Sequence, residues 1–256
     1  MTKPGSNVQR RHFPAGHELI SQGDPGDAAW LIESGTLQVV SETAQGEIPL
    51  ATIGKGAIVG EMALIDQGPR SATVRTLTEV HCVELTRASF EQLIGRCEPL
   101  AGYLLESLVA LIRRVQGLPL REWRTGSAEI RSSRSSQAIL KRQMFNEDYV
   151  FFRQNEPAEN AFLIQSGRVK LTRYERELSR LGPGRIFGAI SLITGSRRLT
   201  TAVADDQVIC EQIPKRQFDA TLAAMPPILR ALTKIYAEQL VTAMNKPPPQ
   251  PPPRGA

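Results

Sequence analysis

The sequence is poor in the residues that build most metal centres and disulfide frameworks. It contains only three cysteines, Cys82, Cys97 and Cys210. No two of them stand in a C-x-x-C spacing, which excludes a disulfide framework and a cysteine-rich metal centre. Its three histidines, His12, His17 and His81, show no ligand spacing such as H-E-x-x-H, so no metal site is expected.

Long apolar runs are also absent. No run reaches the roughly 18 consecutive apolar residues that a membrane-spanning helix needs. The first residues, "MTKPGSNVQRRHF", lack the apolar core of a secretory signal. We therefore expect a cytoplasmic protein with no membrane partner.

Aromatic residues make up only 5% of the 256 residues, whereas glycine and proline contribute 20 and 18. That balance favours many short strands and turns over a helical bundle. The length suits one large domain or two ordinary ones. The net charge of +5 is too weak and too spread out to indicate nucleic-acid binding.

The chain contains an internal repeat. The segment "ISQGDPGDAAWLIESGTLQVV" at 20–40 matches "FRQNEPAENAFLIQSGRVKLT" at 152–172 with a constant offset of 132 residues. Further on, "IGKGAIVGEMALI" at 53–65 matches "LGPGRIFGAISLI" at 181–193, now with an offset of 128. The second copy has thus lost four residues, which we place in the polar "SETAQGEIPL" region. Cys82 and Cys210 share the later offset, and we expect both in strands as buried small hydrophobes.

Each copy predicts a jelly-roll β-barrel followed by a helix. Short apolar pairs alternate with turn signals such as "GDPGD" and "SGT", which is typical of a barrel or jelly roll. After the first copy, Leu104, Leu108, Leu111 and Val115 recur at helical spacing. After the second copy the same pattern is carried by Leu229, Leu232, Ile235, Tyr236 and Leu240.

These patterns predict four segments. Domain 1 spans 1–118, a Gly-, Ser- and Arg-rich linker spans 119–137, and domain 2 spans 138–244. The proline-rich tail at 245–256 is expected to be extended polyproline II without a core, and a ligand for a proline-binding groove is the alternative.

The stretch "GEMALIDQGPRSATV" at 60–74 separates an acid from a base. Gly60 allows close approach of a ligand, and the short helix after it offers unpaired amides to an anion. Arg70, after the Gly68–Pro69 turn, can add a charge-assisted bond to a phosphate. Glu61 would repel a phosphate and suits hydroxyl groups. The stretch therefore predicts a site for a ribose phosphate, and an isolated Glu61–Arg70 surface ion pair is the alternative.

This stretch resembles the phosphate-binding cassette of the cyclic nucleotide-binding domain family, in which Gly-Glu is followed by a small apolar helix and then by Pro-Arg-Ser-Ala. The first strands, "FPAGHELISQGDPGDAAWLIESGTLQV", resemble that family too. The resemblance covers Phe13 to about Val115 and again about Leu140 to Met244, which is most of the chain. Val59 departs from it, since the family often has phenylalanine there.

The resemblance implies a role for each cassette residue of copy one. Arg70 would pair with the exocyclic phosphate oxygens, and Glu61 would accept from the ribose 2′-hydroxyl. Backbone amides of Gly60 and Ala72, and the Ser71 hydroxyl or amide, would contact the phosphate. Met62, Ala63 and Leu64 would line the pocket and transmit its closure to the following helix. No residue is assigned to cap the base; Tyr103 is a candidate, with a core aromatic as the alternative.

Copy two keeps only part of this pattern. Gly188 and Arg198 remain, with Arg197 beside the latter, but Ala189 replaces Glu61. The Ser-Ala pair has become Leu199 and Thr200. Losing a charged hydrogen-bond partner commonly costs about 1.5–3 kcal/mol, so we expect a weak second site, a site for another anion, or a purely structural domain.

The sequence therefore predicts a non-enzymatic regulatory sensor that binds cyclic AMP, or cyclic GMP, at domain 1 and relays the change through helices to a partner protein. Ser71 leans slightly toward cyclic AMP. Two alternatives stay open: an interaction scaffold with nucleotide-insensitive cassettes, and a transcription regulator, for which no DNA-binding helix-turn-helix follows Met244. A homodimer through the C-terminal helices is also left open. No cofactor is expected.

Overall fold

The structure, a computed structural model, describes residues 9–118 and 141–245. The predicted linker and, beyond Asn245, the predicted tail lie outside the described residues. Contacts between Cα atoms divide the chain into two compact units. The second unit includes Cys97–Ile112, which the sequence-based boundary assigns to domain 1, and the domain boundaries stay a prediction.

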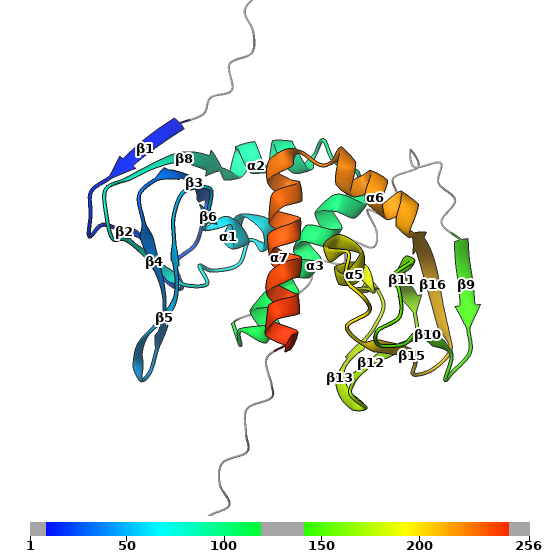
Figure 1. The fold of residues 1–256 in the computed structure, drawn as a ribbon. Coiled ribbons are helices and arrows are strands. Elements are labelled where there is room, and N and C mark those ends of the chain that lie inside the picture. The colour runs from blue at the N-terminus through cyan, green and yellow to red at the C-terminus, as the bar shows by residue number, and fades with distance from the viewer. Residues whose placement is uncertain (1–8, 119–140, 246–256) are drawn as a thin grey trace, which may run out of the picture. The chain divides into compact units, whose positions relative to one another are not determined.

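In the first unit, eight strands form two four-stranded antiparallel sheets (Figure 1, blue to cyan). One sheet has the order β1-β8-β3-β6 and the other β2-β7-β4-β5. The strands are β1 (Gln9–Phe13), β2 (Glu18–Ile20), β3 (Ala28–Ser34), β4 (Leu37–Thr43), β5 (Gly46–Ile53), β6 (Ile58–Val59), β7 (Thr73–Thr76) and β8 (Val80–Thr86).

The second unit repeats this topology strand for strand (Figure 1, green to yellow). Its sheets have the orders β9-β16-β11-β14 and β10-β15-β12-β13. The strands are β9 (Lys141–Phe145), β10 (Val150–Phe152), β11 (Asn160–Ser166), β12 (Val169–Arg173), β13 (Arg176–Leu181), β14 (Ile186–Phe187), β15 (Thr201–Ala204) and β16 (Val208–Pro214). The expectation of two tandem, mainly β barrels with flanking helices is confirmed.

The four residues missing from the second copy fall in one hairpin. Strands β4 and β5 pair out to Thr43 and Gly46, whereas β12 and β13 pair out to Arg173 and Arg176. Two residues link the strands in each case. In the shorter hairpin both linking residues, Tyr174 and Glu175, have positive φ (48° and 63°), as a tight type I′ turn requires.

Each barrel closes over its own apolar core. The first is built from Ile20, Ile32, Leu37, Val59, Val74, Val80 and Cys82. The second is more aromatic and contains Phe152, Phe162, Ile164, Val169, Phe187, Ala202, Ala204, Val208 and Cys210. Burial raises the pKa of the Cys82 thiol to about 11 and that of Cys210 to about 12, which confirms both as inert core side chains.

Helices follow each barrel and also interrupt it. They are α1 (Glu61–Asp66), α2 (Arg87–Ile94), α3 (Pro99–Val115), α5 (Ala189–Thr194), α6 (Lys215–Ala224) and α7 (Pro227–Asn245). Most residues of the predicted apolar stripes are buried, but Val115 is 55% and Ile235 41% exposed. Helical spacing alone misplaced these two, because other apolar residues, Leu105, Val109 and Ile112 in α3, complete its buried face. None of the helices in the described residues is long and apolar enough to cross a membrane.

Two equivalent glycines set the tight turns that precede β4 and β12. Gly35 has φ of +93°, and a Cβ there would lie 2.3 Å from the Glu79 carbonyl oxygen. Gly167 has φ of +80°, and its Cβ would lie 2.3 Å from the Gln207 carbonyl oxygen. At both positions backbone, which cannot swing aside, blocks any side chain.

We predict that Gly35→Ala and Gly167→Ala each lower the free energy of unfolding by about 2–4 kcal/mol, because left-handed strain adds to a backbone clash. Gly16→Ala is the control, since Gly16 has φ of +78° but open space around it. It should cost about 1 kcal/mol from strain alone. Urea unfolding followed by circular dichroism measures all three, and equal losses would contradict the clash.

Candidate functional site

The short helix α1 begins at a glycine whose conformation and surroundings disfavour a side chain. Gly60 is left-handed (φ 80°), and a Cβ there would lie 2.5 Å from Arg70 Nη1 and 3.1 Å from the Ala28 carbonyl oxygen. No side chain among the described residues caps this helix. The backbone amides of its first turn therefore have no side-chain acceptor at the N-cap.

Arg70 is a buried cation, only 7% exposed. Its Nη1 donates to the Gly60 carbonyl at 2.7 Å, and its guanidinium lies 5.4 Å from the centre of the Trp30 ring. The backbone around it is fixed, because Arg70 N donates to the Asp24 carbonyl at 2.8 Å. Burial lowers the pKa of Arg70, and the carboxylates of Asp27 and Glu61 oppose that shift.

The other cassette residues predicted from the sequence lie around this arginine. Glu61 stands in the first turn of α1, close enough to act electrostatically on Arg70. The Ser71 hydroxyl donates to the Met62 sulfur at 3.5 Å, which joins the two ends of the cassette. The apolar members Ala63, Leu64 and Ala72 are 1%, 2% and 7% exposed. The structure thus brings all eight predicted residues together, and their roles in binding stay predictions.

Two further arginines hold the other end of α1, and sequence reasoning missed both. Arg87, at the start of α2, donates to the carbonyls of Gly26, Ala63 and Leu64. Arginine is the only side chain with enough N–H donors in one plane for three such acceptors. Its position directly after β8 gave no sign of this role, because the partners lie more than 20 residues away.

Arg113, near the end of α3, is the second missed residue. Its side chain is 1% exposed and forms a bidentate ion pair with Asp66, the last residue of α1. It also donates to the Pro69 carbonyl at 2.8 Å, next to Arg70. At the offset of the repeat, copy two has Thr194 and Val241 at these positions, so the pair belongs to copy one alone.

In copy two, α5 begins at the equivalent left-handed glycine, Gly188 (φ 77°). Arg198 is 3% exposed and donates to the carbonyls of Gly188 at 2.8 Å and Asn160 at 2.6 Å. The Phe152 ring lies over the guanidinium, 4.0 Å from its centre, where copy one has Ile20. Burial lowers the pKa of Arg198 to about 10, which leaves it charged at neutral pH.

The remaining predicted residues of the second site differ in exposure and in hydrogen bonding, and their role in binding stays a prediction. Ala189 is 7% exposed and offers no acceptor. Arg197 is exposed and donates to the Asn155 carbonyl at 2.7 Å, and its own carbonyl accepts from the Ser191 hydroxyl. Leu199 is half-buried and Thr200 is buried. The second cassette keeps the fold of the first but fills its charged centre with protein groups.

Comparison with known proteins identifies the family. The model of the cyclic nucleotide-binding domain matches residues 10–97 and again 142–224. The two matches cover more than half of the sequence, and the chain therefore belongs to the cyclic nucleotide-binding domain family, in two tandem copies.

The curated relatives are regulatory subunits. The chain is 44% identical over 86 residues to the cAMP-dependent protein kinase regulatory subunit of Emericella nidulans, over 34% of this chain and 20% of that protein. It is 25% identical to the one from Dictyostelium discoideum, over 93% of this chain and 72% of that protein. A solved regulatory domain of Toxoplasma gondii PKA with cAMP is 19% identical, with 91% of this chain and 86% of that chain covered and a TM-score of 0.34.

We predict that Asp66→Ala lowers the free energy of unfolding by about 3–5 kcal/mol, because it leaves the buried Arg113 charge unpaired. Arg113→Met removes that charge and should cost less. In the Arg113→Met background, Asp66→Ala should then add little. Urea unfolding of the four proteins measures this cycle. The control is Thr194→Ala at the equivalent position of copy two, and a loss there as large as that of Asp66→Ala would contradict the assignment.

Proposed function

We propose that this chain is a non-enzymatic cyclic-nucleotide sensor that binds cyclic AMP at the first cassette and relays the change to a partner protein. The observation that carries the proposal is the buried Arg70, held over the glycine that opens α1, with a carboxylate at the next residue. Membership of the family supports the class of ligand. The names of the relatives make a protein kinase the first partner to test.

Arg70 suits the phosphate of such a ligand. Its guanidinium has five N–H donors, and the Gly60 carbonyl occupies one of them at 2.7 Å. Since burial has already removed much of its hydration, a phosphate that reaches it replaces little water and interacts strongly. The amides of Gly60 and Ala72 and the Ser71 hydroxyl complete the anion-binding side of the proposed cassette.

Glu61 suits the ribose. A carboxylate in the first turn of α1 is a strong acceptor for a hydroxyl, and it would repel a phosphate placed against it. The two charges therefore orient the ligand, with phosphate toward Arg70 and sugar toward Glu61. Met62, Ala63 and Leu64 would move with the helix as the cassette closes.

Copy two is proposed to be a structural partner or scaffold. Two backbone carbonyls already take donors of Arg198, and the Phe152 ring covers one of its faces. Ala189 offers no group to a ribose hydroxyl. A nucleotide phosphate would have to break these contacts first, so binding there should be weak.

The end of α3 is the proposed route of the relay. Because Arg113 is bonded to both Asp66 and the Pro69 carbonyl, any movement of α1 or of the turn before Arg70 acts on the last turn of α3. Ligand binding shifts this arrangement only if it favours one position of α1 over another.

Calorimetric titration of the full chain with cyclic AMP tests the proposal. We expect one site per chain, with weaker binding of cyclic GMP. Arg70→Lys should weaken binding about ten- to a hundred-fold, because lysine cannot bond a phosphate through two parallel donors. Glu61→Gln should weaken it through the ribose contact.

Arg198→Lys is the matched control, since it makes the same change at the equivalent residue of copy two. It should alter the affinity by less than about threefold, which is within the normal effect of a distant substitution. Absence of any cyclic-nucleotide binding by the wild-type chain would overturn the proposal. Two equal sites, or equal losses in both variants, would contradict the ranking of the two cassettes.

A further inference from the structure

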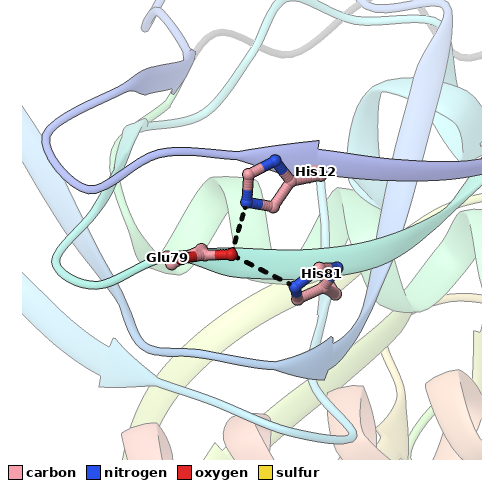
Figure 2. A group of neighbouring side chains, drawn as sticks. All are labelled: His12, Glu79 and His81. Atoms are coloured by element: carbon pink, nitrogen blue, oxygen red, sulfur yellow. Dashed lines mark hydrogen bonds and ion pairs between the residues drawn. The ribbon is translucent and has the colours of Figure 1, made fainter.

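The fold brings together two of the three histidines, which are far apart in the sequence. Strand β1 pairs with β8 so that His12 lies directly opposite His81. Glu79 precedes His81 by two residues at the start of β8, next to both rings (Figure 2). The expectation that the histidines are scattered and form no site followed from linear spacing, which says nothing about cross-strand neighbours.

The three side chains point their ligand atoms at one another. His12 Nε2 lies 2.8 Å and His81 Nε2 lies 3.5 Å from the same oxygen, Oε1 of Glu79 (Figure 2). The centroids of the two imidazole rings are 4.7 Å apart. One ligand atom from each residue can be chosen so that all three lie within 4.8 Å of one another.

From this juxtaposition we propose a binding site for a divalent transition metal ion, Zn²⁺ in particular, at the β1–β8 edge of the first barrel. Imidazole nitrogens and a carboxylate oxygen are ordinary zinc ligands at about 2.0–2.2 Å. In a tetrahedral site this places neighbouring ligand atoms roughly 3.4 Å apart, which lies within the range of the two nitrogen–oxygen separations, 2.8 and 3.5 Å. A fourth position is left to water or to a group from a partner.

The surroundings of these three residues favour a role in metal binding over a simple ion pair between histidine and glutamate. The side chains of His12, Glu79 and His81 are 51%, 65% and 55% exposed, so an ion in solution can reach all three. A His–Glu ion pair this exposed contributes little by itself. The nearby cation on the same face of β1, Arg10, is already paired with Glu33 at 3.2 Å.

The backbone that carries Glu79 is fixed in advance. In the turn before it, Leu77 N donates to the Thr36 carbonyl at 2.8 Å, and Thr36 N donates to the Thr78 hydroxyl at 3.0 Å. His12 and His81 are held by the strand pairing itself. A bound ion would thus need only side-chain adjustment, and it would fasten the edge strand β1 to β8.

Calorimetric titration of the full chain with ZnCl₂ in a non-chelating buffer tests the site, with MgCl₂ as the comparison. We expect one saturable Zn²⁺ site and no Mg²⁺ binding, because Mg²⁺ prefers oxygen ligands. His12→Ala and His81→Ala should each weaken Zn²⁺ binding at least about tenfold, since even outer-shell partners are worth roughly ten- to a hundred-fold. Circular dichroism checks that both variants fold.

The third histidine provides the matched control. His17 is exposed and stacks against Phe13, outside the group, so His17→Ala should leave Zn²⁺ affinity unchanged. Cu²⁺ added to the wild type should show nitrogen hyperfine coupling from two imidazoles in electron paramagnetic resonance, and His12→Ala should show one. Absence of saturable Zn²⁺ binding, or equal loss in His17→Ala, would overturn the proposal.

Discussion

A guanidinium out of water must find acceptors, and this requirement shapes the cassette in each unit. Arg70 and Arg198 are 7% and 3% exposed, and both donate to the carbonyl of the left-handed glycine that opens a six-residue helix. A Cβ would lie 2.5 Å from Arg70 Nη1 at Gly60 and 2.7 Å from Arg198 Nη1 at Gly188. In the first unit, a Cβ at Gly26 would also lie 2.5 Å from Arg70 Cζ. In the first unit, the buried charge of Arg70 therefore constrains the start of α1 and the loop around Gly26.

The two units meet this requirement with different partners. In both units carboxylates act on the arginine from some distance, Asp27 and Glu61 in the first and Glu156 and Glu159 in the second. In the second, the arginine also donates to the Asn160 carbonyl and lies against the face of Phe152. The same exchange of aliphatic for aromatic residues recurs in the second core, where Phe152 and Phe187 occupy the positions of Ile20 and Val59. The second unit thus lacks the carboxylate of Glu61 and gains an aromatic ring against its arginine.

The sequence was enough to predict those features of the fold that depend on local residue patterns and on the internal repeat. Two copies at a constant offset imply one topology used twice, and a four-residue deletion in a polar stretch implies a shorter hairpin; β12 and β13 show both. The contacts of Arg87, Arg113 and His12 could not be predicted, because each depends on a partner brought close only by strand pairing or helix packing. Exposure of Val115 was missed for a related reason: periodicity gives the spacing of an apolar face but not which of several faces is covered.

A helix of six residues is too short to be stable alone, so its position depends on what holds its two ends. At its N-terminal end α1 contacts Arg70 through the Gly60 carbonyl, and at its C-terminal end it contacts Arg87 through carbonyls and Arg113 through Asp66. An anion that accepts hydrogen bonds from Arg70 would alter the bond between Arg70 and the Gly60 carbonyl. It would not directly touch the contacts of Arg87 and Arg113. Arg113 joins the far end of α1 to the last turn of α3 through its ion pair with Asp66. Copy two has Thr194 and Val241 where this ion pair stands, and its short helix α5 instead packs directly against α7.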